Sequence, residues 1–100
     1  MTVRVDPENN ETRALLDLVD FTGKRVLEIG CGDGRLTWQY ADRAKHVTAI
    51  DPKAEAIRQA KENLSDELKN RLEIHQFTFE DFSAISKPSS FDTVIFSWSF

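Results

Sequence analysis

The chain has 100 residues, of which 40% are hydrophobic and 30% are charged, a balance typical of one small globular domain or part of a larger one. Its net charge is −4 and its lysines and arginines are scattered, so no basic stripe predicts binding to the phosphate backbone of nucleic acids. With one cysteine, the chain cannot form an internal disulfide framework. It has no apolar run of membrane-spanning length and no signal-peptide core, which favours a soluble cytoplasmic protein.

The first part of the chain predicts a helix, a strand and a second helix. The first helix covers residues 11–19, with Asn10 or Thr12 as its cap. A strand follows over 25–29, and a glycine-rich loop then leads into a helix over 34–44. The side chains expected to face inward are Ala14, Leu15, Leu18 and Val19 in the first helix and Leu36, Tyr40, Ala41 and Ala44 in the second.

The middle of the chain continues the alternation. A second strand over 47–50 ends at Asp51, and a third begins at 72–75. Between them, a helix over 53–64 could extend in broken form to Leu68. Its inward residues are expected to be Ile57, Ala60 and Leu64.

The last part predicts a short helical turn or loop over 79–85, a loop over 87–90 and a fourth strand over 91–97. Strands that alternate with helices indicate βαβ units, a parallel sheet and right-handed crossovers. We therefore expect an α/β fold, a Rossmann-like three-layer sandwich with a parallel sheet.

The fourth strand is the most apolar of the four, and its centre is typical of a strand with neighbours on both sides. As an edge strand it would present unpaired backbone groups together with apolar side chains. We therefore expect more sheet to follow Phe100, so that residues 1–100 are the N-terminal part of a single domain, truncated after its fourth strand. The alternative is a small natural domain whose sheet edge is covered by a partner.

Residues 26–34 read Val-Leu-Glu-Ile-Gly-Cys-Gly-Asp-Gly, a strand that runs into three alternating glycines. Backbone without Cβ atoms reaches positive φ and lets a ligand approach closely. Since ligands of open parallel sheets lie beyond the carboxyl ends of the strands, Gly30, Gly32 and Gly34 predict a nucleotide-like cofactor. The dinucleotide fingerprint would need a glycine where Arg35 stands, and no Lys-Ser or Lys-Thr pair follows to make a Walker loop.

Glu28 is a carboxylate in an otherwise apolar strand, which is costly unless the charge is paired or hydrated. Its presence is explained if its head faces a polar, positively charged ligand at the strand tip. The stretch from Glu28 to Gly34 resembles the Glu/Asp-x-Gly-x-Gly-x-Gly first motif of class I S-adenosylmethionine-dependent methyltransferases. The resemblance implies that the acid and the glycines hold the methionine part of S-adenosylmethionine and the region beside its ribose. Cys31 would be the small residue that fits between backbone and ligand, and not a nucleophile.

Three further segments agree with this resemblance. An acid that ends the second strand is expected to accept hydrogen bonds from ribose hydroxyls, and Asp51 takes this role with Pro52 packed on the adenine. Dinucleotide enzymes use the same position, and Asp51 could instead cap the helix that begins at 53. After the third strand, the resemblance implies adenine contacts in one of two registers. The preferred register uses Thr78, the backbone of Phe79 and nearby Glu80, and the other uses Glu80 or Asp81.

The end of the fourth strand borders the sulfonium in this family, which places Ser97 and Trp98 at the methyl-transfer site. The Ser97 carbonyl would receive the amino group of the cofactor. The chain reads Ser-Trp-Ser-Phe here, where enzymes that methylate exocyclic base nitrogens or glutamine amides usually carry Asn/Asp-Pro-Pro-aromatic. This argues against those acceptors and leaves small molecules or other acceptors open.

The resemblance implies a methyltransferase that acts on an unidentified small molecule, with no catalytic base assigned and with the 100-residue segment inactive alone. The alternatives are a non-catalytic Rossmann-like binding module and a nicotinamide-dependent oxidoreductase. No metal is expected, because His46 and His75 are not spaced as ligands. The sequence does not indicate an oligomeric state.

Overall fold

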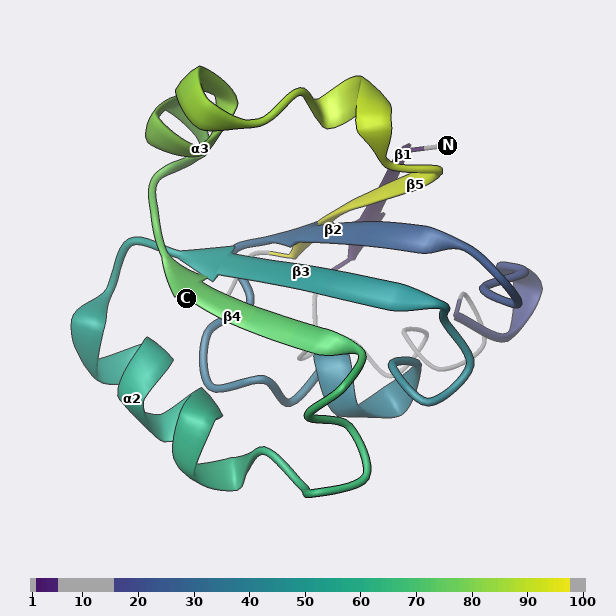
Figure 1. Ribbon diagram of the computed structural model, residues 1–100, viewed down its shortest axis with the longest axis horizontal. Helices are drawn as coiled ribbons and strands as arrows, with labels where there is room; N and C mark the ends of the chain where they lie inside the picture. The colour runs from purple at the N-terminus through teal and green to yellow at the C-terminus, as the bar shows by residue number, and fades with distance from the viewer. Residues whose placement is uncertain (1, 6–15, 98–100) are drawn as a thin grey trace.

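A computed structural model of the chain describes residues 2–5 and 16–97 (Figure 1). Its centre is a five-stranded, all-parallel sheet with the strand order β1-β5-β2-β3-β4. Helix α2 and helix α3 lie on opposite faces of the sheet, so the predicted α/β, Rossmann-like architecture is confirmed. The elements are β1 Thr2–Val5, β2 Arg25–Ile29, the 3₁₀ helix η1 Thr37–Gln39, β3 His46–Asp51, α2 Ala54–Asn63, β4 Leu72–Gln76, α3 Phe79–Ile85, the 3₁₀ helix η2 Pro88–Ser90 and β5 Thr93–Ser97.

The sheet edge beside β5 carries a strand that sequence analysis missed. Strand β1 pairs with β5 in parallel, in a register that places Thr2 opposite Val94 and Val5 opposite Ser97. Strand β5 thus has neighbours on both sides, as predicted, but its second neighbour is the N-terminal segment of the chain and not a strand that follows Phe100. Four residues carry too short an alternation to separate a strand from an extended N-terminal arm.

The predicted helix over 34–44 is wrong. The segment consists of turns around η1, in which Tyr40 N donates to Thr37 O at 3.3 Å and Arg43 N donates to Tyr40 O at 2.9 Å. These i to i−3 bonds wind more tightly than an α-helix but return side chains to the same side about every third residue. The inward residues are therefore buried as predicted, namely Leu36, Tyr40, Ala41 and Ala44.

The other helical predictions have mixed outcomes. Helix α2 buries Ile57 and Ala60 as expected, while residues 66–70 form turns and do not extend the helix. The segment over 79–85 is a regular helix, α3. Of the first predicted helix, only 16–18 lie among the described residues as helix, and Asn10, Thr12, Ala14 and Leu15 lie outside them. Leu18 is 85% exposed while Leu16 is buried, so the predicted inward face is wrong at Leu18.

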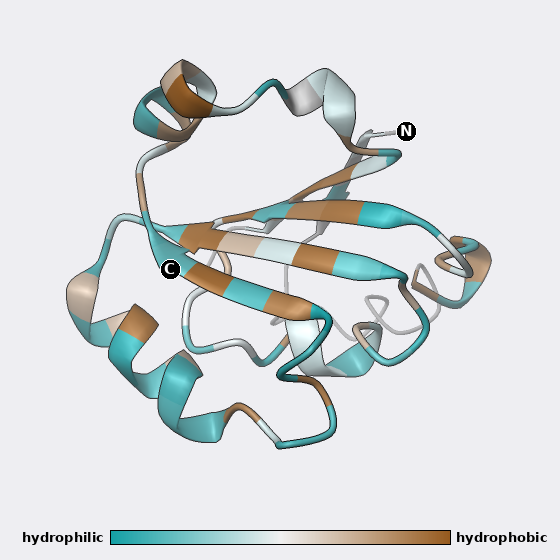
Figure 2. Ribbon diagram, viewed as in Figure 1, coloured by the Kyte–Doolittle hydropathy of each residue, from teal (hydrophilic) through white to brown (hydrophobic). Residues whose placement is uncertain are grey.

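The core has two parts, one on each face of the sheet. The face that carries Val26 and Glu28, called the Glu28 face below, packs against η1 and α2 through residues such as Val47, Ala49 and Ile57. The opposite face, called the α3 face, carries Leu27, Ile50 and Phe82. Figure 2 shows the resulting hydrophobic bands on the strands and the hydrophilic outer side of α2. Among the described residues, no helix has the length and apolarity needed to cross a membrane.

Candidate functional site

The glycine loop follows β2 at its carboxyl end, as predicted. Gly30, Gly32 and Gly34 have φ angles of 82°, 56° and 93°, all in the left-handed region. Gly30 N and Cys31 N both donate to Ile50 O, at 2.8 and 3.1 Å, and this ties the loop to the end of β3. The loop therefore lies where the carboxyl ends of the central strands meet, the position at which open α/β sheets bind ligands.

Gly30 also lies close against the end of β5. A Cβ atom built on Gly30 would lie 2.1 Å from the backbone oxygen of Ser97. Two constraints thus require glycine here, the positive φ and the neighbouring carbonyl. The contact places the end of β5 directly against the loop.

Replacing Gly30 by alanine is expected to lower the free energy of unfolding by roughly 3 kcal/mol, because strain and a backbone clash add together. Gly23→Ala is the matched control: Gly23 has φ 70° but nothing within 4 Å of a built Cβ. The control should lose only roughly 1 kcal/mol, from backbone strain alone. Urea unfolding of both variants measures the difference, and equal losses would contradict the close approach of Ser97.

Asp51 ends β3 and is 5% exposed. Its Oδ2 accepts a hydrogen bond from Gly32 N at 3.0 Å and its Oδ1 accepts one from Lys53 N at 2.8 Å. The carboxylate therefore fastens the glycine loop to the turn that precedes α2. A carboxylate has about four acceptor sites, so these two bonds leave room for further donors.

Glu28 is fully buried in the middle of the Glu28 face. Its Oε1 accepts hydrogen bonds from Thr37 Oγ1 at 2.9 Å and from Tyr40 Oη at 2.6 Å. Its Oε2 is buried and has no hydrogen-bond partner among the described residues. The segment that contains η1 covers Glu28, and the predicted contact between the head of Glu28 and a ligand stays a prediction.

Burial raises the pKa of Glu28 from 4.5 to about 7, although the hydrogen bonds from Tyr40 and Thr37 lower it. The negative charge of Asp51 adds to the rise. Glu28 pairs in register with Ala49, and Asp51 follows Ala49 by two residues on β3, so both acids point to the same face. No lysine or arginine among the described residues contributes to the pKa of Glu28. Among the described residues, the site thus holds two neighbouring buried acids without a cation, an arrangement that is costly unless Glu28 keeps its proton or a cation joins the two acids.

Cys31 is buried in the glycine loop, close enough to both acids for their charges to affect it. Burial raises the pKa of its thiol far above the usual value, and the charges of Glu28 and Asp51 raise it further. The thiol therefore stays protonated at neutral pH and is a poor nucleophile.

The residues at the start of α3 lie near the end of β5. Thr78 is the N-cap of α3, and its hydroxyl accepts a hydrogen bond from Asp81 N at 3.0 Å. Phe79 is 36% exposed and meets Phe96 edge to face, with ring centroids 6.1 Å apart. Glu80 is exposed. The Thr78 side chain thus caps the N-terminus of α3. The roles of Thr78, Phe79 and Glu80 in binding a cofactor stay predictions.

The other predicted cofactor-binding residues are Pro52, Ser97 and Trp98, of which Pro52 and Ser97 differ in burial. Pro52 is exposed, and its carbonyl accepts a hydrogen bond from Gln76 Nε2 at 3.4 Å. Ser97 is buried at the end of β5, beside Gly30. Trp98 lies outside the described residues.

Thr37 and Tyr40 are site residues that sequence analysis did not identify. Tyr40 was assigned only to the core, where its ring does stack on Phe21 with centroids 4.6 Å apart. The available signal was a pair of hydroxyl side chains on the inward side of the segment after the loop, opposite a strand with a buried acid. Both donate to the same oxygen of Glu28.

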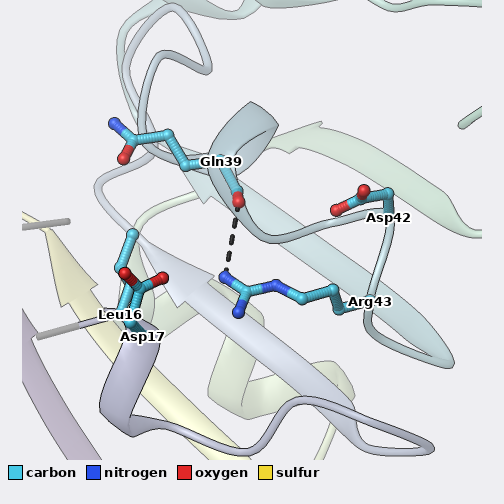
Figure 3. Close-up of a pocket in the computed structure, with 5 residues that line it drawn as sticks. All are labelled: Leu16, Asp17, Gln39, Asp42 and Arg43. Atoms are coloured by element: carbon cyan, nitrogen blue, oxygen red, sulfur yellow. Dashed lines mark hydrogen bonds between the residues drawn. The ribbon is translucent and has the colours of Figure 1, made fainter. Parts of the chain in front are cut away.

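Among the described residues, hollows lie away from the glycine loop. One, of about 250 Å³, is lined by Leu16, Asp17, Gln39, Asp42 and Arg43, and Arg43 donates to Gln39 O across it at 3.5 Å (Figure 3). Another, of about 400 Å³, lies on the α3 face and includes Arg25, Glu73 and three phenylalanines. His46 and His75 both approach Glu73 there, at 3.2 and 3.6 Å. Within residues 2–5 and 16–97 no set of three metal-ligating side chains is arranged to hold a metal ion.

Comparison with known proteins agrees with this geometry. Residues 26–100 match the family model described as a methyltransferase domain. The ubiquinone biosynthesis O-methyltransferase of Aromatoleum aromaticum is 38% identical over 73 residues, which cover 69% of this chain and 31% of that protein. The 23S rRNA (uracil(1939)-C(5))-methyltransferase of Methylococcus capsulatus is 37% identical over 67 residues, which cover 67% of this chain and 14% of that protein.

A solved structure is also similar. The phosphoethanolamine N-methyltransferase 1 of Haemonchus contortus, in complex with phosphoethanolamine and S-adenosylhomocysteine, superposes with a TM-score of 0.70 at 25% identity. The match covers 90% of this chain and 19% of that one. The chain spans less than a third of the length of either curated relative named above.

Proposed function

Because the chain belongs to the family of methyltransferase domains, we propose that the protein binds S-adenosylmethionine and transfers its methyl group to a small-molecule acceptor. In this proposal residues 1–100 form the N-terminal part of a single cofactor-binding domain in a cytoplasmic enzyme. The proposal is supported chiefly by the two buried acids Glu28 and Asp51, which share one face beside the glycine loop and have no cationic partner within residues 2–5 and 16–97.

The residues at this site fit the cofactor chemically. S-adenosylmethionine carries a cationic sulfonium and a cationic ammonium group, and two acids without a cation suit a positively charged ligand. The unpartnered Oε2 of Glu28 is an acceptor that lacks a donor, and a buried acceptor of this kind is rare unless a ligand or water completes it. Asp51 retains acceptor capacity for a vicinal diol beyond its two backbone bonds.

The proposed contacts follow from these positions. Glu28 and the loop would hold the methionine part and the region beside the ribose, and Asp51 would accept hydrogen bonds from the ribose hydroxyls. The remaining residues proposed to line the cofactor are Gly30, Cys31, Gly32, Gly34, Pro52, Thr78, Phe79, Glu80, Ser97 and Trp98. When bound, the cofactor supplies an activated methyl group, so the chain needs chiefly to orient the acceptor in line with it.

A small-molecule acceptor is proposed from the residues at the end of β5 and from the names of similar proteins. Ser-Trp-Ser-Phe at 97–100 departs from the sequence expected for enzymes that methylate exocyclic base nitrogens or glutamine amides. The names of two similar proteins refer to small molecules, ubiquinone and phosphoethanolamine, while a third refers to 23S rRNA. Arg35 at the position of the third dinucleotide glycine disfavours a nicotinamide cofactor.

Calorimetric titration of the intact protein with S-adenosylhomocysteine and, separately, with NADH tests this proposal. We expect micromolar binding of S-adenosylhomocysteine and none of NADH. Tight binding of NADH without S-adenosylhomocysteine binding would support the oxidoreductase alternative and overturn the proposal. Cofactor binding without methyl transfer to any of a panel of small-molecule acceptors would favour the non-catalytic binding module.

A further inference from the structure

The two oxygens of Glu28 have opposite surroundings. Oε1 accepts two hydrogen bonds, from Thr37 and Tyr40, whereas Oε2 is equally buried and accepts none among the described residues. Both donors come from one short segment, that of η1 and the residue after it. The segment therefore fixes the orientation of the carboxyl group through Oε1 and donates no hydrogen bond to Oε2.

In the part of the chain that the structure describes, the groups around Glu28 offer it no positive charge. Asp51 comes from β3, Cys31 from the glycine loop and Tyr40 from the segment of η1, and each of these is neutral or negative when it titrates. Strand β5 contributes apolar Ile95 opposite Glu28. With no cation among these described groups, a proton bound to Oε2 would neutralise Glu28 until a cationic ligand binds.

We propose that Thr37 and Tyr40 are positioning residues that hold Glu28 for the cofactor, and that binding of the cofactor's cationic part expels a proton from Glu28 to solvent. The inference rests on the proposed function and adds to it a proton-linked uptake of the cofactor. Before binding, the carboxyl group is largely protonated at mildly acidic pH, because burial raises its pKa to about 7. After binding, the neighbouring cation favours the carboxylate, and the O–H bond of Glu28 breaks as its proton leaves to the buffer.

Two features separate this role from ordinary core packing. Packing of the Tyr40 ring on Phe21 does not depend on the hydroxyl, so Tyr40→Phe keeps the stack and removes only the donor. Thr37→Val likewise keeps the β-branched shape and removes the other donor, while Thr37→Ser restores it. Because hydrogen bonds to a charged carboxylate favour the charged form, either loss should move the titration of Glu28 to higher pH.

The test is calorimetric titration of the intact protein with S-adenosylhomocysteine, whose ammonium group is cationic and does not titrate near neutral pH. Titrations in two buffers of different ionisation enthalpy at about pH 6 count the protons released. We expect the wild type to release most of one proton at about pH 6 and almost none at about pH 8.5. In Tyr40→Phe and Thr37→Val the pH at which affinity is half-maximal should rise by about one unit, and Thr37→Ser should restore it.

The outcomes separate this inference from the function on which it rests. Binding by the wild type without proton release, and with the same pH profile in Tyr40→Phe, would overturn the inference and leave the cofactor assignment standing. Failure of the wild type to bind S-adenosylhomocysteine at every pH would overturn the proposed function, and this inference with it. Circular dichroism of each variant confirms that the fold is retained.

Discussion

Replacing Glu28 by glutamine is expected to stabilise the folded protein at pH 8 while removing most of its affinity for S-adenosylhomocysteine. The acid has a pKa of 4.5 in its unperturbed state and about 7 when folded, mainly because of burial. Between these values the unfolded chain has lost its proton and the folded chain keeps it. The stability that the protonated acid provides is therefore present below pH 4.5 and is lost as the pH rises towards 7.

The size of this loss follows from the pKa shift, at about 3 kcal/mol once the pH exceeds 7. Glutamine does not titrate and resembles the protonated acid, because its amide oxygen can accept from Thr37 and Tyr40. Urea unfolding should therefore show a stability advantage of Glu28→Gln that grows between pH 5 and pH 8 by up to about 3 kcal/mol.

Glu67→Gln is the matched control for this experiment, since Glu67 is exposed. The control should leave both the pH dependence of unfolding and the affinity unchanged. A Glu28→Gln variant that is less stable than wild type at pH 8, or that differs from it equally at all pH values, would contradict the raised pKa. Retained affinity for S-adenosylhomocysteine would remove Glu28 from the cofactor site.

Replacing Asp51 by asparagine is expected to weaken S-adenosylhomocysteine binding by ~100-fold or more, because charge-assisted hydrogen bonds to the ribose hydroxyls contribute roughly 1.5–3 kcal/mol each. The substitution also affects the loop directly. An asparagine has one acceptor oxygen, so the bonds that Asp51 accepts from Gly32 and Lys53 cannot both persist. A decrease in stability of roughly 1–2 kcal/mol should accompany the loss of affinity.

Asp66→Asn is the control, because the Asp66 side chain is 92% exposed and pairs with Lys69 on the surface. Calorimetry gives the affinity and urea unfolding shows that the variant is folded under the conditions of the titration. Unchanged affinity in a folded Asp51→Asn protein would exclude Asp51 from the binding site.

Much of the architecture could be predicted from local patterns. The four strands over 25–29, 47–50, 72–75 and 91–97 were read from apolar runs between turn residues, and their alternation with helices gave the parallel sheet. Glu28 and Asp51 share a face because β2 pairs with β3 in parallel, with Glu28 opposite Ala49. Asp51 lies two residues after Ala49, and side chains two residues apart on a strand point to the same face.

The errors have physical causes that local patterns do not contain. The segment over 34–44 has inward residues at helical spacing, but 3₁₀ turns bury the same residues and bring the hydroxyls of Thr37 and Tyr40 onto Glu28. Strand β1 exists only through its pairing with β5, a contact between the two ends of the chain. The cover over Glu28 was missed for a similar reason, because it depends on how the segment after the loop folds back over the sheet.

The central claim is that the glycine loop seats the adenosyl cofactor, and amide resonances of the glycines test it most directly. The chain has four glycines, of which three lie in the loop, while Gly23 precedes β2 at the opposite end of that strand. In a ¹⁵N-labelled protein titrated with S-adenosylhomocysteine, the resonances of Gly30, Gly32 and Gly34 should shift and saturate together while Gly23 stays unchanged. Saturable binding that leaves all three loop resonances in place would contradict the account.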